Sequence, residues 1–280
     1  MIQAKPKMKI SSLFVYIGLI VIAVFSIFPV IWMMGISLKP VTESVAGFGA
    51  MYTSHPTWQN FASIFKLMPF WHNAWNSVFT TLVGMVSTLF FCSLAGFAFA
   101  KFQFPGRNVL FYVVIATMLI PLEVGIVPLF IIMRKLELIN SLWSLIIPKA
   151  ATAVGIFYMR QYIMAVPTEI LESAKMDGCS DFRTYRSIIL PIIKPALASW
   201  AALTVIARWN DFFWPLIFLR TKEKFTLMVS ISLLPVSEGL STPWPVIMAG
   251  TSMAVIPIML LYFIFQRYQV AGLSSGAVKG

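Results

Sequence analysis

The chain has 280 residues, of which 59% are hydrophobic and 11% are charged, and its formal net charge is +11. Soluble domains carry about 25% charged residues, and a chain of this length cannot hide so much apolar surface in a core. The composition therefore excludes a soluble globular protein and predicts a protein of the lipid bilayer. Anionic headgroups and the cytoplasmic bias of basic loops explain the positive charge, so we expect no nucleic-acid partner.

Six runs of the chain are long and apolar enough to cross a bilayer as helices, which takes about 20 apolar residues each. The alternation of period two that is typical of membrane barrels is not visible in the sequence. We therefore predict an all-α fold with one polytopic transmembrane domain over residues 12–268. The predicted spans are residues 12–37, 75–100, 109–133, 141–163, 188–219 and 246–266.

The first predicted span follows a basic segment, residues 1–11, that carries Lys5, Lys7 and Lys9. Its apolar run is longer than the roughly 7–15 residues of a signal peptide and no small-x-small cleavage site follows, so we predict a retained signal anchor. With a cytoplasmic N-terminus, the loops on that side hold eleven Lys and Arg and the other loops hold seven. This bias places residues 1–11 and the tail, residues 269–280, in the cytoplasm.

The longest predicted external loop, residues 39–72, contains a short amphipathic helix. Thr57 is its expected N-cap, and five apolar residues share one face of it. We expect the helix to pack on the ends of the spans or to lie at the membrane interface. The residues of this face are Trp58, Phe61, Ile64, Phe65 and Met68.

Residues 166–187 form a polar cytoplasmic loop that we predict as two short helices. Thr168 is the expected N-cap of the first helix, and Gly178 ends it. Ser180 is the expected N-cap of the second helix, which presents Phe182, Tyr185 and Ile189 on one face. The predicted fifth span then opens at Pro191.

The first of these two helices is acidic, with Glu169, Glu172 and Asp177 against a single Lys175. A helix that lies on anionic headgroups carries Lys and Arg on its polar face, so a mere connector at the lipid surface fits poorly. Asp177 also stands near the helix C-terminus, where a negative charge is unfavourable. These features favour a protein partner with basic residues.

The same loop resembles the E-A-A-x3-G-x9-I-x-L-P loop of the permeases of binding-protein-dependent ABC importers. The sequence reads Glu172-Ser173-Ala174, three residues, Gly178, nine residues, Ile188, one residue, and Leu190-Pro191. One position departs from the pattern, because Ser173 replaces the usual alanine.

Most of the chain is also similar to the six-span permease subunit of the carbohydrate importers of the maltose and lactose type. The similar segments are Phe28-Pro29 to Lys39-Pro40, Trp58-Gln59-Asn60-Phe61, Asn76-Ser77, Arg208-Trp209-Asn210-Asp211-Phe212-Phe213-Trp214-Pro215-Leu216, and residues 272–280. This resemblance implies a type I ABC importer permease fold in the cell (inner) membrane of a bacterium or archaeon.

The resemblance further implies a subunit that forms half of a sugar pathway by alternating access. The first polar helix is then a coupling helix in which Glu172 pairs with a basic residue of a separate ATPase, and Ser173, Ala174 and Asp177 belong to the same docking loop. Gly178 lets the two helices cross, and Ile188, Leu190 and Pro191 anchor the loop to span five. The tail residues implied to contact the ATPase are Ser275, Gly276 and Lys279.

The expected partners are two ATP-binding subunits, a second permease, an extracytoplasmic solute-binding protein and an oligosaccharide. The second permease is a homologous chain or another copy of this one, and the resemblance favours a distinct homologous chain. The sequence contains no Gly-x4-Gly-Lys-Ser/Thr phosphate cradle. We therefore expect no enzymatic activity and no cofactor in this chain, with ATP and Mg²⁺ bound by the partner ATPases. Cys92 and Cys179 lie at different depths without a nearby histidine, so we expect no metal site.

Charged residues inside predicted spans are expensive and usually functional. Glu123 lies between two prolines of span three, and Asn210 and Asp211 lie in span five, so these three are candidates for the pathway or for substrate contact. Arg208 and Asp211 are three residues apart, which allows an internal salt bridge with a purely structural role. Lys149 is expected to face a partner or water.

Two other classes of protein remain as alternatives. A proton-coupled secondary transporter would use Glu123 and Asp211 as proton carriers, but it leaves the 166–191 loop unexplained. An intramembrane protease would need a Gly-x-Ser-x-Gly element or an embedded histidine, and the sequence has neither. Within the ABC family, glycerol 3-phosphate or another non-sugar substrate is a further alternative.

Overall fold

The computed structural model describes residues 10–237 and 242–277, and the regular elements in these ranges are helices, with no strand among them. The α-helices of the first half are α1 (Ile10–Ser37), α2 (Gln59–Leu67), α3 (Phe70–Lys101), α4 (Arg107–Ala116), α5 (Ile126–Lys135) and α6 (Trp143–Ile146). Those of the second half are α7 (Ala153–Met164), α8 (Thr168–Met176), α9 (Asp181–Thr184), α10 (Leu190–Ile192), α11 (Lys194–Trp209), α12 (Phe213–Phe218), α13 (Leu227–Ser237) and α14 (Trp244–Ala277). Short 3-10 turns are η1 (Phe48–Met51), η2 (Thr117–Leu119), η3 (Leu122–Gly125) and η4 (Ile147–Lys149), and η5 (Tyr185–Ile189) is a π-helical turn.

Three helices are each long and apolar enough to cross a membrane: α1, α3 and the first part of α14. Two further candidates in the described ranges are bent pairs: Arg107–Leu119 with Glu123–Lys135 at 94°, and Asp181–Ile192 with Lys194–Trp209 at 79°. The predicted span 141–163 is not among these five, because it is divided into α6, η4 and α7. The all-α prediction is confirmed, and the count of six spans stays a prediction.

Proline explains where most of these interruptions occur. Pro121 separates η2 from η3, Pro148 lies in η4, and Pro195 directly follows the bend at Ile193. A proline removes a backbone donor and clashes with the preceding turn, so it favours a helix end at these points. Pro29 and Pro257, by contrast, lie inside the uninterrupted helices α1 and α14.

The chain divides into two compact units, one of which comprises Met1–Met68 and Leu233–Val255. In this unit the Asn60 amide donates to the carbonyl oxygens of Ser37 and Lys39, at 2.8 Å each. The predicted loop helix is present as α2, but its N-cap is Trp58 and not Thr57 as predicted. Thr57 Oγ1 lies one residue earlier and accepts from Gln59 N, the first residue of the helix, at 3.2 Å. Its predicted apolar face is only partly correct: Ile64 is buried, but Trp58 is 73% exposed because α2 turns Asn60 inward instead.

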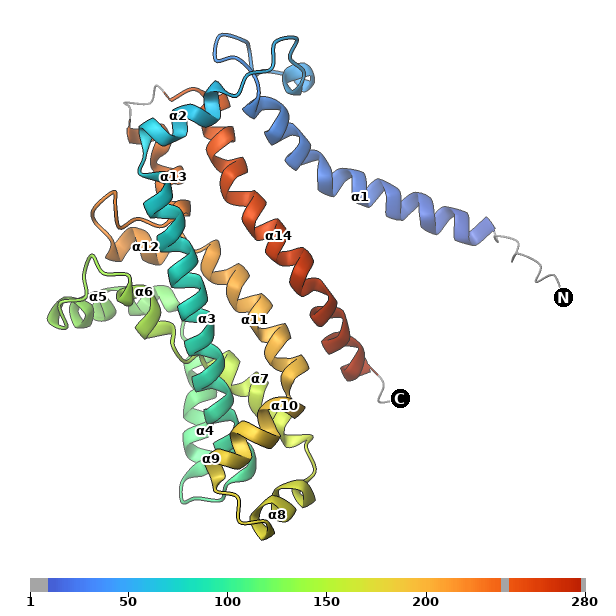
Figure 1. The fold of residues 1–280 in the computed structure, drawn as a ribbon, viewed down its shortest axis with the longest axis vertical. Helices are drawn as coiled ribbons and strands as arrows, with labels where there is room; N and C mark the ends of the chain where they lie inside the picture. Colours follow the sequence, from blue (N-terminus) through green and yellow to red (C-terminus); the bar gives the residue numbers. More distant parts are fainter. Residues whose placement is uncertain (1–9, 238–241, 278–280) are drawn as a thin grey trace. The chain divides into compact units, whose positions relative to one another are not determined.

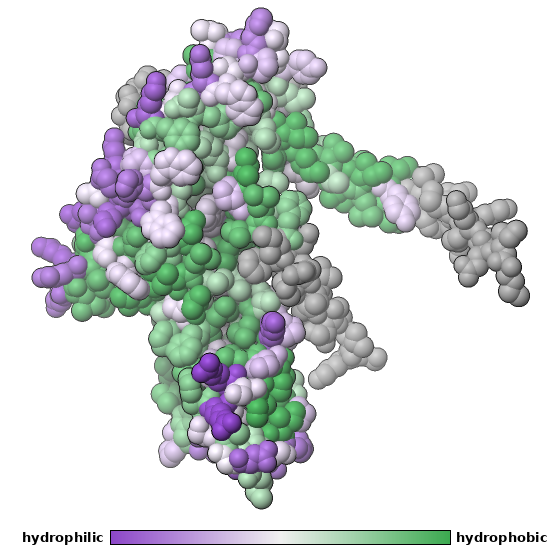
Figure 2. Space-filling model, in the orientation of Figure 1, coloured by the Kyte–Doolittle hydropathy of each residue, from purple (hydrophilic) through white to green (hydrophobic). Residues whose placement is uncertain are grey.

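The other unit comprises Pro69–Ser232 and Ile256–Gly280, and α3 is its central helix, with α7 and α11 packed against it (Figure 1). The α3–α7 contact is close at Gly96, where an added Cβ would lie 2.8 Å from Met159 Cβ. Hydrophobic side chains follow the length of this unit, and hydrophilic ones gather at the end that carries α8 and also over the end of α5 and the loop before α13 (Figure 2). This pattern suits a body that is surrounded by lipid along its length and reaches water at its end.

Candidate functional site

The polar loop contains the two predicted helices, with one difference at its start. Helix α8 begins at Thr168, with Pro167 in the N-cap position and no side-chain cap. The prediction that Thr168 is the N-cap is therefore wrong, because Pro167 already provides the non-helical turn (φ −57°, ψ 138°) that precedes the helix. Glu169 lies in the first turn, where a carboxylate stabilises the helix dipole.

Gly178 ends α8 in a Schellman motif, as predicted. Cys179 N donates to Ala174 O at 2.9 Å and Gly178 N donates to Lys175 O at 3.0 Å, which satisfies the last carbonyls of the helix. Gly178 has a φ of 75°, in the left-handed region that disfavours residues with a Cβ. The turn therefore requires glycine, although there is open space around it.

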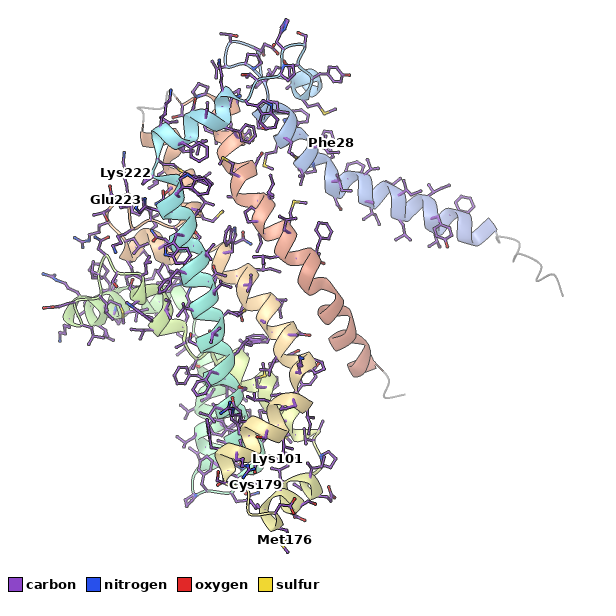
Figure 3. The ribbon with its side chains drawn as sticks, in the orientation of Figure 1. Phe28, Lys101, Met176, Cys179, Lys222 and Glu223 are labelled. Carbon is purple, nitrogen blue, oxygen red and sulfur yellow. The ribbon has the colours of Figure 1, made fainter. Side chains whose placement is uncertain are left out.

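One face of α8 is packed and the other is free. Leu171 and Ala174 are buried, whereas Glu172, Ser173 and Asp177 are exposed. The exposed side chains also include Met176, which is 89% exposed at the tip of the loop (Figure 3). Met176 was not among the residues predicted from the sequence. An unbranched apolar side chain in an otherwise polar turn would have marked it as a contact residue.

The second half of the loop is fixed to α3. Ser180 Oγ accepts from Arg183 N at 3.4 Å and caps α9, as predicted. Tyr185 is buried, and its hydroxyl lies 2.7 Å from Ser93 Oγ. Lys101, the last residue of α3, donates to the Val166 carbonyl just before α8. Both ends of the loop are therefore attached to the same helix.

Two expectations about this half are corrected. Phe182, in the first turn of α9, is 57% exposed and does not share the burial of Tyr185 and Ile189, although its ring centre lies 6.0 Å from that of Tyr185. Pro191 does not open span five: residues 181–192 form one stretch that bends by 79° at Ile193 before α11 begins. Ile188 and Leu190 are half-buried in that stretch, and Pro191 is exposed.

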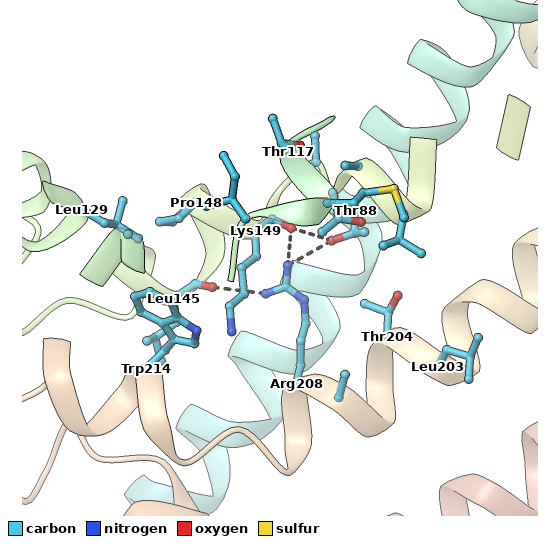
Figure 4. A pocket seen from close by; sticks show the side chains of 18 of the residues that line it. Thr88, Thr117, Leu129, Leu145, Pro148, Lys149, Leu203, Thr204, Arg208 and Trp214 are labelled. Atoms are coloured by element: carbon cyan, nitrogen blue, oxygen red, sulfur yellow. Dashed lines mark hydrogen bonds between the residues drawn. The ribbon is translucent and has the colours of Figure 1, made fainter. Parts of the chain in front are cut away.

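A second polar cluster lies beside the middle of α3. Arg208 donates to the carbonyl oxygens of Leu145 at 3.2 Å and Lys149 at 2.7 Å, and to Thr88 Oγ1 at 3.0 Å (Figure 4). Gly84 leaves room for the guanidinium, since a Cβ there would lie 2.3 Å from Arg208 Nη1. Arg208 thus satisfies carbonyls where the helix is interrupted between η4 and α7, which non-helical backbone at membrane depth requires.

Asp211 pairs with Lys149 and not with Arg208, so the predicted internal salt bridge is wrong. Asp211 Oδ2 lies 2.5 Å from Lys149 Nζ, and its Oδ1 accepts from Trp214 N at 3.3 Å. The α11 helix ends before Asp211, and this break turns the carboxylate away from Arg208 and toward the start of α12. The Lys149 ammonium also lies 5.6 Å from the centre of the Trp214 ring, a cation–π contact.

The other pathway candidates are not brought together. Asn210 is exposed at the end of α11, and Glu123 is exposed in η3. A cavity of about 990 Å³ lies beside the Arg208 cluster, and none of Glu123, Asn210 and Asp211 lines it. Its walls include Thr88, Pro121, Lys149, Trp200, Thr204 and Arg208.

The predicted ATPase-contacting tail is described only in part. Ser275 and Gly276 belong to the last turn of α14, and Lys279 lies outside the described residues. In the described part of the chain, no three His, Cys, Asp or Glu residues are arranged to hold a metal ion.

Residues 92–275 match the family described as the binding-protein-dependent transport system inner membrane component, and the chain belongs to this family. The predicted family is thereby confirmed.

Among curated relatives, the chain is 36% identical over 267 residues to the arabinooligosaccharides transport system permease protein AraQ of Halalkalibacterium halodurans, covering 94% of this chain and 95% of the relative. It is 33% identical to AraQ of Bacillus subtilis, with both chains fully covered. It is 32% identical to the lactose transport system permease protein LacG of Rhizobium radiobacter, with 92% of each chain covered.

The fold is similar to that of a chain in the crystal structure of a bacterial ABC transporter that imports the acidic polysaccharide alginate. The TM-score is 0.80 at 26% identity, covering 96% of this chain and 99% of the other. The elements described above are therefore those of an ABC importer permease.

Proposed function

We propose that this chain is the permease subunit of an ATP-driven importer that receives an oligosaccharide from a solute-binding protein. In this proposal a separate ATPase docks on the loop of residues 166–191, and the chain forms half of the pathway by alternating access. Family membership and the sugar-transport names of the AraQ and LacG relatives support the substrate class.

The observation that carries the docking role is the geometry of α8. The helix is ended by a glycine turn, presents Glu172 and Met176 to solvent and keeps Leu171 and Ala174 on the core. An exposed apolar side chain beside carboxylates is a recognition surface for a protein groove with a basic residue. The Ser93–Tyr185 and Lys101–Val166 hydrogen bonds then transmit a force on the loop to α3.

The contacts at the two ends of α3 support the proposed assignment of loops to the cytoplasmic and the external side of the membrane. Asn73 and Asn76, in its first turns, donate to the carbonyls of Lys222 and Glu223, whereas Lys101 at its last residue contacts the loop before α8. A helix of 32 residues is about 48 Å long, enough to cross a bilayer. Lys222 and Glu223 are accordingly far from Met176 (Figure 3). With the α8 loop in the cytoplasm, the loop with Lys222 faces the solute-binding protein.

The remaining parts of the proposal concern partners. ATP and Mg²⁺ belong to two ATP-binding subunits, since this sequence lacks a phosphate cradle, and a homologous second permease supplies the other half of the pathway. The tail with Ser275, Gly276 and Lys279 is proposed to contact the ATPases, and the host membrane is the cell membrane of a bacterium or archaeon, with both termini cytoplasmic.

The test is oligosaccharide uptake by proteoliposomes that contain the complete importer, with ATP inside and a loaded binding protein outside. We expect uptake to require ATP and to be unchanged by a protonophore. Arabinotriose, lactose and diacetylchitobiose are the first probes, because relatives carry these substrate names. Uptake that the protonophore abolishes would identify a secondary transporter, and uptake of glycerol 3-phosphate alone would refute the sugar assignment.

A further inference from the structure

The cavity beside Arg208 lies where three interruptions of the helices meet. Pro121 follows η2, Pro148 and Thr152 enclose the gap before α7, and Trp214 belongs to α12 after the break at Asn210; all four residues line the cavity. Thr88, on the same cavity, is the nineteenth of the 32 residues of α3 and therefore lies near the middle of that helix. Interrupted helices at the midplane commonly form substrate sites in transporters, and their backbone needs a polar or watery environment.

Most polar groups on the cavity wall are already used. Thr88 Oγ1 bonds to Gly84 O, Thr117 Oγ1 to Val114 O and Ser144 Oγ to Ser141 O. Thr152 caps α7, and Arg208 is bonded to two carbonyls and to Thr88. These groups shape the cavity and do not need a ligand.

Thr204 differs from them. It is only 8% exposed and lines the cavity, yet within the described part of the chain its hydroxyl has no hydrogen-bond partner (Figure 4). A threonine in a helix normally bonds to the carbonyl four residues earlier, so a buried hydroxyl without this bond has an unmet donor and acceptor. Thr204 Oγ1 is not one of the fully buried side-chain atoms without a partner, so it is reachable from the cavity, and a molecule in the cavity can bond it.

Lys149, in η4, provides a second free donor that lines the cavity. Its ammonium has three N–H groups, of which Asp211 takes one, and the side chain remains 30% exposed. The other walls are largely apolar and include Leu203 and Trp200. A cavity lined by one free hydroxyl and one ammonium among apolar and aromatic side chains matches a sugar, which has hydroxyls on the edges of its rings and C–H groups on their faces.

We propose that this cavity is an oligosaccharide-binding subsite within this subunit, in which Thr204 and Lys149 bond hydroxyls of the sugar. The volume of about 990 Å³ is at the upper end for small-molecule sites and holds a ring with its linked neighbour. This inference rests on the proposed function for the identity of the ligand. It adds that the permease chain itself binds the substrate, at a site that neither Asn210 nor Asp211 lines.

The test uses a cysteine at Leu203, which lines the cavity and is 49% exposed, in the complete importer with Cys179→Ser. The rate of labelling by a methanethiosulfonate is measured with and without the probe sugar that the importer takes up. We expect the sugar to slow labelling of Leu203→Cys several-fold. We expect no effect at Leu216→Cys, which is 39% exposed on α12 and does not line the cavity.

The Thr204→Val change keeps the shape of the side chain and removes the hydroxyl. Loss of one hydrogen bond should raise, by about threefold to tenfold, the sugar concentration that halves the labelling rate of Leu203→Cys. Thr81→Val is the matched control, because Thr81 is also buried without a hydrogen-bond partner in the described residues but is not on the cavity wall. It should leave protection unchanged.

Several outcomes would overturn the subsite. One is a Leu203→Cys that is unreactive even without sugar, which would mean that lipid or the second permease fills the cavity. Another is an unprotected Leu203→Cys in an importer that still takes up the sugar; the proposed function would then stand without the subsite. Equal shifts for Thr204→Val and Thr81→Val would also refute it. Absence of ATP-driven uptake of every probe sugar would instead refute the proposed function.

Discussion

Gly178 connects a local backbone requirement to the docking role that is proposed for the loop. Its φ of 75° costs about 1–2 kcal/mol for a residue with a Cβ. We expect Gly178→Ala to loosen the end of α8 and to reduce sugar uptake per ATP hydrolysed, measured by parallel uptake and phosphate-release assays on the complete importer. Insertion into the membrane should be unchanged, because the substitution is small and surrounded by open space.

The control for this change is Gly106→Ala. Gly106 has a φ of 79° and open space around it, so it carries the same backbone penalty outside the α8 loop. We expect Gly106→Ala to leave the ratio of uptake to hydrolysis unchanged. If the two variants lower that ratio equally, backbone strain alone explains the effect and the coupling role of Gly178 is refuted.

Gly84 is a glycine for a different reason, namely space for Arg208. A Cβ at position 84 would lie 2.3 Å from the guanidinium, so Gly84→Ala displaces Arg208 from the carbonyls that it bonds. Overpacking of this kind costs about 1–3 kcal/mol. We expect Gly84→Ala to lower the Tm in detergent. Gly18→Ala in α1 should leave the Tm unchanged, because a Cβ at position 18 meets nothing within 4 Å. An unchanged Tm for both would mean that Arg208 is mobile.

The roles of some single residues were predictable from the sequence, and those of others were not. Gly178 and Ser180 follow from helix-ending and helix-capping preferences, which act between near neighbours in the chain. The partners of Arg208 were not predictable, because two of them are main-chain carbonyls, which every residue has. The Lys149–Asp211 pair joins residues 62 apart, a distance over which helix spacing has no predictive value.

Among the elements, the interruptions of η4–α7 and α11–α12 are joined by the Lys149–Asp211 pair. Removing one partner of a half-buried pair leaves an unpaired charge, which is more damaging than removing both. We expect Lys149→Met and Asp211→Asn each to lower the Tm of the importer, and the double variant to lower it less than the sum of the two. A double-mutant cycle from thermal unfolding measures this coupling, and strictly additive losses would contradict it.

The interruptions themselves were only partly predictable. Prolines occur both at helix ends, as with Pro121 and Pro148, and inside continuous helices, as with Pro29 and Pro257. The sequence marks the residue that weakens a helix, but packing against neighbours determines whether the helix ends there. For this reason span five was predicted as one run, although the structure divides it at Ile193 and again after Trp209.

For the molecule as a whole, composition was sufficient to predict an all-helical membrane protein, and one twenty-residue pattern was sufficient for the family. Composition is a sum over residues, and the pattern is confined to neighbours in the chain, so both can be evaluated from the sequence without coordinates. The cavity depends on residues from five separated segments, and its free hydroxyl at Thr204 is recognisable only once every neighbouring acceptor is placed. A pathway in a membrane is a property of assembled helices, and no single stretch of sequence carries it.

The uninterrupted course of α3 has a consequence for how such a protein moves. Near one end it holds the segment at residues 222–225 through two asparagines, and at the other it holds the α8 loop through Ser93 and Lys101. With no proline and no break between these attachments, α3 behaves as a stiff rod. Under the proposed function, a tilt imposed at the end that holds the α8 loop moves the opposite end of α3 the other way, so a single rigid helix would couple ATPase docking to substrate entry.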